Sequence, residues 1–455
     1  MESAGMPASR YACVQLAARS GIRAKPVAME MRVITDSKRR KRLMASAALL
    51  GGVLALAACG GSSAADRGLG DGGDSTRHEN VQQVDAAAAK DASDARIKIL
   101  PADGATDAGI NSDALVTVSN GKLTDVAMTS VDAKKTVDGT LSADGSSWKP
   151  NQPLNRSTKY KVTAHAVDAQ GRTAVENSTF TTVSPANSFI GNFTPEDGST
   201  VGVGMPVSVN FDKPVTNKTA VQSAINVSDD SNQPVVGHWF NDKRLDFRPQ
   251  EYWKANSRVT MTLSLDGVEA SPGVTGIQNK TVGFRVGHSQ ISTVDSKKHE
   301  MTVVRDGRTI KTLPISAGSD EHPTYNGQMV ISERFKQTRM DGSTVGFKKK
   351  GGKGEYDIHD VPHAQRLTSS GTFIHGNYWG KGVFGHANTS HGCIGLQDVK
   401  GAKDAKTDGA WFFDHSQTGD VVKVVNASDQ TVKPDNGLNG WNMAWSQWVA
   451  GSAVH

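Results

Sequence analysis

Hydrophobic and polar residues alternate along most of the chain after residue 95, which is the pattern of strands with one buried face. The clearest alternating runs are 115–118, 160–164, 207–211 and 259–265. Turn residues separate such runs about every ten positions. Aromatic residues make up only 6% of the chain while glycine is abundant, which suits turn-rich β structure better than packed helices. The pattern therefore predicts a mostly β protein.

An internal repeat divides the first part of this β-rich region. Pro101-Ala102-Asp103-Gly104 recurs as Pro195-Glu196-Asp197-Gly198, and alternating strands follow each copy. A repeat of roughly 95 residues built from short strands is typical of β-sandwiches in tandem. The two units, expected over 96–185 and 186–286, resemble bacterial immunoglobulin-like domains. Neither contains a cysteine, and we expect them to act as spacers or to orient a substrate.

A third unit is expected over 287–425. It opens with a predicted strand at 290–295 and a predicted hairpin over 300–308, and it has no long amphipathic helical pattern. The remaining segment, 426–455, contains Trp441, Trp445 and Trp448, whose spacing fits one helical face. We expect that face to dock the segment onto a neighbouring domain.

The N-terminal region has the order of a secretory signal. A basic run, Lys38–Arg42, precedes an uncharged apolar stretch, Leu43–Ala58, that is short for a spanning helix. Small residues before Cys59 resemble the lipobox of bacterial lipoproteins, which implies cleavage before Cys59 and lipidation of its sulfur. The alternative is an uncleaved N-terminal anchor. Residues 1–58 are therefore expected to form a leader and signal peptide, and 59–95, rich in Gly, Ser, Ala and Asp, a flexible tether.

Charge and cysteine content narrow the function. The net charge of +5 comes from the leader, because ten basic and three acidic residues precede Cys59 and leave 41 basic and 43 acidic residues after it. A nearly neutral mature chain gives no electrostatic reason to bind nucleic acid. With Cys13 removed and Cys59 lipidated, Cys393 is the one free thiol. Exported proteins rarely keep an unpaired cysteine without a use for it.

The sequence around this thiol is suited to nucleophilic chemistry. His375-Gly376 lies upstream, and Ser390-His391-Gly392-Cys393 ends the segment. A cysteine nucleophile at neutral pH needs its thiol deprotonated, usually by a nearby imidazole. Glycines beside the cysteine let backbone N–H groups approach a developing oxyanion.

The spacing His-x14-Ser-His-Gly-Cys resembles the signature of the L,D-transpeptidases, whose YkuD-type catalytic domain cross-links bacterial peptidoglycan. The whole layout, with a lipobox, two immunoglobulin-like domains, a β-rich catalytic domain and a Trp-rich C-terminal segment, is similar to that of actinobacterial members. The resemblance implies that Cys393 is the nucleophile. His375 is then its base, held in tautomer by the backbone carbonyl of Gly376.

The same resemblance assigns supporting roles. His391 and Ser390 would order the catalytic loop, and the amides of Gly392 and Cys393 would form the oxyanion hole. Residues expected on the substrate side are Tyr356, Trp379 and Asn377. Two positions depart from the family pattern: Gly395 replaces a polar residue two positions after the cysteine, and His322–Gly327 replaces the usual Thr-Pro-x-Gly stretch.

The implied reaction needs no cofactor and no metal. The thiolate attacks a tetrapeptide stem, D-Ala leaves, and an amine of a second stem opens the thioester to give a 3→3 cross-link. Donor and acceptor stems are thus the expected partners, and carbapenems the expected inhibitors. The expected location is the outer face of the cytoplasmic membrane, through the lipid anchor.

Two other functions fit the sequence. Six potential zinc ligands crowd into a short region, namely His359, His363, His375, His386, His391 and Cys393, which suits a zinc-dependent cell-wall peptidase. The chain lacks His-Glu-x-x-His, however. The second alternative is a non-catalytic lipoprotein that binds the wall through its sandwiches.

Overall fold

The computed structural model describes residues 92–111 and 113–454. The predicted signal peptide over 1–58, the lipidation site Cys59 and nearly all of the tether lie outside the described residues. Within these two ranges no helix combines the length and the apolar character that a membrane span requires. The mostly β fold class is confirmed.

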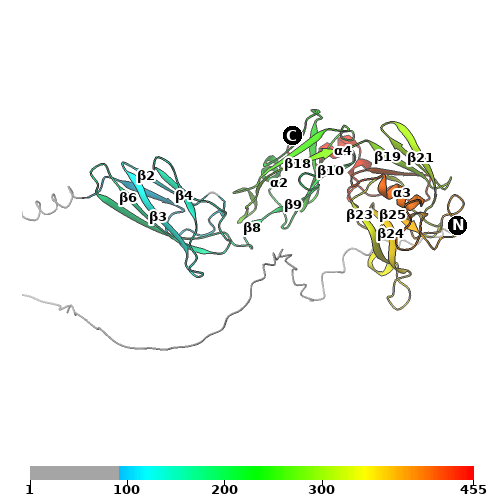
Figure 1. The fold of residues 1–455 in the computed structure, drawn as a ribbon, viewed down its shortest axis with the longest axis horizontal. Coiled ribbons are helices and arrows are strands. Elements are labelled where there is room, and N and C mark those ends of the chain that lie inside the picture. The colour runs from blue at the N-terminus through cyan, green and yellow to red at the C-terminus, as the bar shows by residue number, and fades with distance from the viewer. Residues whose placement is uncertain (1–91, 112, 455) are drawn as a thin grey trace, which may run out of the picture. The chain divides into compact units, whose positions relative to one another are not determined.

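The first sandwich pairs a four-stranded sheet with a three-stranded sheet (Figure 1). The larger sheet contains, in spatial order, β1 (Arg96–Leu100), β2 (Leu115–Ser119), β5 (Ser147–Pro150) and β4 (Gly139–Leu141). The smaller contains β3 (Lys122–Ser130), β6 (Lys159–Val167) and β7 (Thr173–Thr181). Alternate residues of these strands face a core that includes Trp148, Tyr160 and Phe180.

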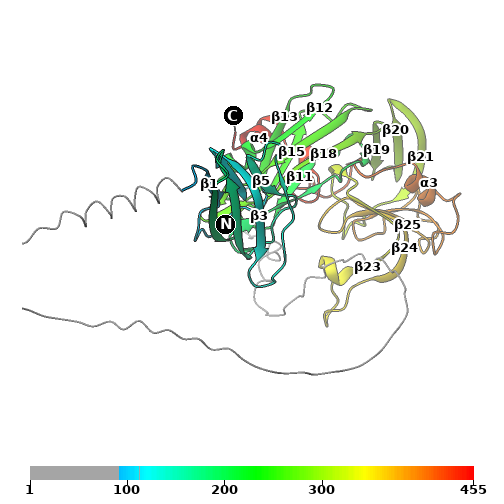
Figure 2. The same cartoon turned by 60° about the vertical axis from the view of Figure 1, so that its left-hand side comes forward.

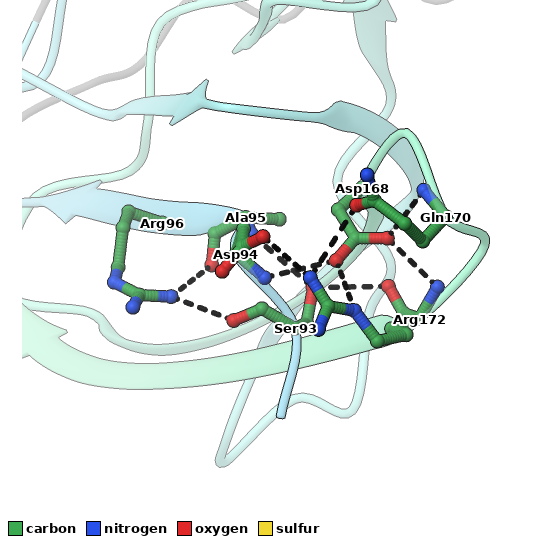
Figure 3. Close-up of polar contacts among 7 residues, drawn as sticks. All are labelled: Ser93, Asp94, Ala95, Arg96, Asp168, Gln170 and Arg172. Carbon is green, nitrogen blue, oxygen red and sulfur yellow. Dashed lines mark hydrogen bonds and ion pairs between the residues drawn. The ribbon is translucent and has the colours of Figure 1, made fainter. Parts of the chain in front are cut away.

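A polar cluster fastens the beginning of this sandwich to the turn between β6 and β7 (Figure 3). The buried carboxylate of Asp168 accepts hydrogen bonds from the backbone N–H groups of Asp94, Gln170 and Arg172, each at 2.9 Å, and pairs with the Arg172 guanidinium at 2.7 Å. Ser93 donates its hydroxyl to the Arg172 carbonyl at 2.9 Å. The folded sandwich therefore already includes Ser93 and Asp94.

The second sandwich has its own core and three sheets. Its strands and helix are β8 (Ser188–Phe189), β9 (Gly191–Thr194), β10 (Thr200–Val201), β11 (Val207–Phe211), α2 (Lys218–Ser223), β12 (Ile225–Asp229), β13 (Val235–Asn241), β14 (Arg244–Pro249), β15 (Arg258–Ser264), β16 (Glu269–Ser271), β17 (Val274–Gly276) and β18 (Asn279–Val286). The sheet orders are β10-β18-β15-β12, β13-β14-β11-β9 and β16-β17-β8. Phe211, Trp253 and Phe284 are among the buried residues between them.

The repeated Asp-Gly corner makes the same contacts in both sandwiches. Asp103 accepts from the N–H of Thr179 at 2.7 Å, and the N–H of Gly104 donates to the carbonyl of that same residue at 2.7 Å. Asp197 and Gly198 make the equivalent pair with Gly283, at 2.8 and 2.7 Å. The sequence repeat therefore corresponds to a structural repeat.

A nine-stranded sheet forms the third unit. In spatial order its strands are β22 (Gly327–Val330), β27 (Val421–Val425), β19 (Gln290–Asp295), β20 (Glu300–Arg305), β21 (Arg308–Ser316), β26 (Ile394–Gln397), β25 (Phe373–Asn377), β24 (Asp357–Arg366) and β23 (Glu333–Asp341). Strands β23, β24 and β25 lie side by side in both views (Figures 1 and 2). The short helix α3 (Asp408–Asp414) contributes Phe412 to the buried core, and the 3-10 turn η1 (Gly342–Val345) follows β23.

The Trp-rich segment is not one helix, so the prediction of a single helical face is wrong. Trp441 lies in a 3-10 turn, η2 (Gly440–Asn442), and the other two tryptophans lie in α4 (Trp445–Ala450), because the backbone is extended at Met443 and Ala444. The three rings nevertheless converge on the buried guanidinium of Arg248, whose central carbon is 4.2–5.3 Å from their centroids.

These contacts join the segment to the second sandwich. The indole N–H of Trp441 donates to the carbonyl of Gly204 at 2.7 Å, and that of Trp448 donates to Val236 at 2.9 Å. Earlier in the segment, Val432 belongs to the core of the nine-stranded unit. The segment thus packs against both folded units.

Candidate active site

Two neighbouring parallel strands carry the Cys-His motif. His375 lies in β25 opposite Gly395 of β26, and Cys393 directly precedes β26. Because side chains alternate across a strand, His375 points to the same face of the sheet as Gly395, two residues after Cys393. The residues between His375 and Cys393 therefore form the end of one strand and the loop that leads to the neighbouring strand.

The two side chains line one cavity of about 400 Å³. Its walls also include Tyr356, Asn377, Trp379, Ser390 and His391, so every side chain that the sequence proposed for catalysis or substrate contact meets here. The glycines Gly376 and Gly392 contribute backbone only. The further wall residues, which the sequence did not single out, are Met340, Ile358, Gly380, Lys381, Val383 and Thr389.

His375 is held in one tautomer. Its Nδ1 donates a hydrogen bond of 2.8 Å to the carbonyl of Gly376, which leaves Nε2 as the unprotonated nitrogen. Burial lowers the pKa of the imidazole, while the Gly376 carbonyl and the charge of Asp398 act in the opposite direction. Trp379, 42% exposed, stacks on the ring with centroids 5.6 Å apart. His375 is therefore neutral and able to accept a proton.

Cys393 is a neutral thiol in this structure. Its Sγ donates to the carbonyl of Gly371 at 3.7 Å. Burial raises the pKa of the thiol to about 11, and the backbone N–H of Phe373 acts against that rise. Since burial also disfavours the imidazolium of His375, the resting pair is uncharged. Both shifts favour the neutral thiol and the neutral imidazole over the charged pair.

The loop before Cys393 is fixed by Ser390. The Ser390 hydroxyl donates to the carbonyl of Cys393 at 2.6 Å and accepts from the N–H of Gly392 at 3.2 Å. Gly392 has a φ of 104°, which side-chain-bearing residues rarely adopt. The Gly392 N–H is therefore already hydrogen-bonded at rest. To donate to an oxyanion it must either leave the Ser390 hydroxyl or donate to both acceptors at once.

Asn377 lies beside the unusual Gly395. The side-chain oxygen of Asn377 accepts from the N–H groups of Trp379 and Gly380, at 3.0 and 2.7 Å, and so shapes the turn that carries Trp379. A Cβ at Gly395 would lie 3.3 Å from Nδ2 of Asn377. The space beside residue 395 is therefore occupied by a polar side chain from the adjacent strand.

Asp398 supports the strand that carries His375, and the sequence did not single it out. Its fully buried carboxylate accepts from Nδ1–H of His363 at 2.7 Å, from the Thr407 hydroxyl at 3.0 Å and from the N–H of Val399 at 2.7 Å. It also lies against Gly376, where a Cβ would be only 2.1 Å from Oδ2. Asp398 thus supports the backbone that fixes the His375 tautomer.

A second histidine cluster lies at the cavity wall. Nε2 of His391 is 3.2 Å from a carboxylate oxygen of Glu355, and Nε2 of His322 is 3.9 Å from the same oxygen. Tyr356 packs on His391, and burial raises the pKa of its phenol beyond the usual range. In the described ranges, His322, Glu355 and His391 are the one set of three close metal-ligand side chains. Of the six zinc ligands suggested by sequence, only His391 belongs to it, so the structure does not assemble that proposed zinc site.

Comparison with known proteins identifies the family of the chain. The L,D-transpeptidase catalytic domain (YkuD) matches residues 289–424, and a bacterial Ig domain matches residues 105–269. L,D-transpeptidase 2 of Mycobacterium tuberculosis (strain CDC 1551 / Oshkosh) is 35% identical over 77% of this chain and 83% of its own length. L,D-transpeptidase 5 of strain H37Rv is 30% identical over 79% and 77%.

Solved structures include the L,D-transpeptidase LdtMt1 in complex with imipenem, which is 30% identical with a TM-score of 0.43 over 51% of this chain and 97% of that one. Family membership follows from the sequence matches, which extend over most of both chains. The chain belongs to the L,D-transpeptidase family.

Proposed function

We propose that this enzyme forms 3→3 cross-links between peptidoglycan stems through a thioester on Cys393. The observation that carries the proposal is the meeting of Cys393 with a tautomer-locked His375 in one cavity. The chain's membership of the L,D-transpeptidase family supplies the reaction class, acyl transfer between a donor and an acceptor stem.

Acylation begins with a proton transfer. Nε2 of His375 accepts the thiol proton as Sγ of Cys393 leaves the Gly371 carbonyl and attacks the donor carbonyl before the terminal D-Ala. The C–N bond then breaks, and the imidazolium returns its proton to the departing amine of D-Ala. Because both groups are neutral beforehand, charge separation occurs only when a substrate occupies the site.

The developing oxyanion needs backbone donors. The amide of Cys393 lies directly before β26, and the amide of Gly392 becomes available once it releases Ser390. Ser390 has a second contact, to the Cys393 carbonyl, that does not depend on the Gly392 amide. This loop therefore supports both nucleophile and oxyanion hole.

The second half-reaction is amide formation. An amine from an acceptor stem attacks the thioester, His375 takes the amine proton, and the thiolate of Cys393 leaves and is reprotonated. One amide replaces another, so no ATP or cofactor is required. Trp379, exposed above His375, is positioned to cover the acyl-enzyme from water.

A soluble form tests this directly. It should begin at Ala92, because a start at Arg96 would remove the Ser93 and Asp94 contacts of Figure 3. Incubated with a disaccharide-tetrapeptide, it should release D-Ala and form dimers detectable by mass spectrometry, whereas Cys393→Ala should do neither. Cross-linking by Cys393→Ala would refute the mechanism. Carbapenems should add to Cys393 of the active form.

We also propose that the chain is exported and lipid-anchored at Cys59 on the outer face of the cytoplasmic membrane. The support is the basic, apolar and small-residue order that ends at Cys59. Metabolic labelling with a fatty acid should mark the wild type and not Cys59→Ala. Equal labelling of both would contradict the anchor.

A further inference from the structure

Three loops, distant in the sequence, bring His322, Glu355 and His391 together. His322 lies between β21 and β22, Glu355 between η1 and β24, and His391 between β25 and β26. Their ligand atoms all lie within 4.8 Å of one another. Each side chain is about one-third exposed, so the cluster is accessible from solvent.

The arrangement approaches the geometry of a bound transition metal. Ligands of a tetrahedral zinc ion at bond lengths of about 2.0–2.2 Å are about 3.3 Å apart. The His391 and Glu355 atoms, 3.2 Å apart, already meet this, and His322 at 3.9 Å needs a small shift. The two imidazole rings are stacked at 14° with centroids 4.8 Å apart, so they must tilt away from each other to direct both nitrogens at one ion.

The surroundings also suit such an ion. The ring of Phe347 packs edge-on against both histidines, with centroids 5.1 and 5.3 Å away, and Tyr356 covers His391. Two imidazoles and one carboxylate form a ligand set typical of zinc-class ions, with a fourth position left for water.

We propose that His322, Glu355 and His391 bind a divalent ion of the zinc class, and that its occupancy slows the transpeptidase. The ion takes no part in the chemistry. It would tie the loop that carries Tyr356 to the Ser390–Cys393 loop, because Glu355 precedes Tyr356 and His391 lies within that second loop. Both loops line the cavity, and in the second loop the Gly392 amide, a proposed oxyanion donor, is bonded to Ser390 at rest. The inhibitory half rests on the proposed function, whereas the binding half does not.

Binding can be measured without any turnover. Full-length protein in detergent, with Cys13, Cys59 and Cys393 all replaced by Ala to remove thiol binding, is titrated with zinc chloride by calorimetry near neutral pH. We expect one ion per chain, and an affinity at least about tenfold weaker for added His322→Asn or Glu355→Gln. His359→Asn, a change at a 73% exposed histidine of β24, is the matched control and should bind like its parent. Circular dichroism confirms that each variant is folded.

Inhibition is then measured on chains with an intact thiol. Zinc should slow release of D-Ala by the wild type and by His359→Asn at concentrations near the measured Kd, and chelation should reverse it. His322→Asn and Glu355→Gln should keep their metal-free rates in zinc. Binding that is absent, or unchanged in both variants, overturns the site and leaves a hydrogen-bonded network. Binding without slower turnover overturns the inhibitory role alone.

Discussion

Replacing Asp398 with Asn removes one negative charge behind the catalytic histidine while preserving shape. Oδ1 of the new amide can still accept from Val399 and Thr407, as the carboxylate does at 2.7 and 3.0 Å. The amide nitrogen that replaces Oδ2 is a donor 2.7 Å from Nδ1 of His363, so His363 must move its proton to Nε2 and accept a bond that is then between neutral groups. Because a charged acceptor contributes about 1 kcal/mol more than a neutral one, the free energy of unfolding should fall by about 1 kcal/mol.

The same change weakens the general base. The charge of Asp398 raises the pKa of His375, so its removal lowers that pKa further and destabilises the imidazolium formed during acylation. A loss of about 1 kcal/mol in the transition state is about a fivefold slower acylation. The acid limb of the kcat/KM profile should move to lower pH, because the base loses its proton at lower pH.

A matched control separates charge from stability. Thr407→Val removes one bond to Asp398 and the cap that accepts from the N–H of Ala410 at 3.2 Å, which costs about 1 kcal/mol, yet leaves the carboxylate charged. It should lower the unfolding free energy without moving the acid limb. Acylation by a carbapenem, followed across pH, gives the profiles. An Asp398→Asn profile that superimposes on that of the wild type would refute the role of Asp398.

Three further outcomes follow from the structure. Iodoacetamide should alkylate Cys393 of the free enzyme slowly at neutral pH and faster up to pH 9, since the pKa of the thiol is raised to about 11; a plateau near pH 7 would contradict this. Gly376→Ala, whose Cβ would meet Asp398, should lower both melting temperature and acylation rate, and wild-type values for both would show that the backbone there can move. Arg248→Met should lower the melting temperature because its guanidinium donates to the carbonyls of Gly440 and Met443 between three tryptophan rings; an unchanged value in calorimetry would count against that cluster.

The order of the folded units could be predicted from the sequence because their strands have one buried face. Two predicted strands, 207–211 and 290–295, have the bounds of β11 and β19. The tryptophan segment could not be predicted in this way. Its backbone conformation is set by contacts with Arg248 and the second sandwich. These contacts override the helical spacing of the three tryptophans.

Some residues of the candidate site could likewise be predicted from the sequence, and others could not. The motif that contains His375 and Cys393 is local to one strand–loop–strand segment, so spacing alone could identify it. Asp398, Glu355 and His322 come from other loops and carry no local pattern, although the altered stretch at His322 was visible. The raised pKa of the Cys393 thiol could not be predicted either, because it depends on burial in the fold rather than on neighbouring residues in the sequence.

The most direct measurement is intact-mass spectrometry of rapidly quenched enzyme mixed with a tetrapeptide donor alone. The account predicts a donor-minus-D-Ala adduct confined to Cys393, with one equivalent of D-Ala released, and its disappearance into cross-linked product when an acceptor stem is added. Cross-linked product that forms with no adduct on Cys393 at any time, or an adduct that an acceptor never consumes, would contradict it.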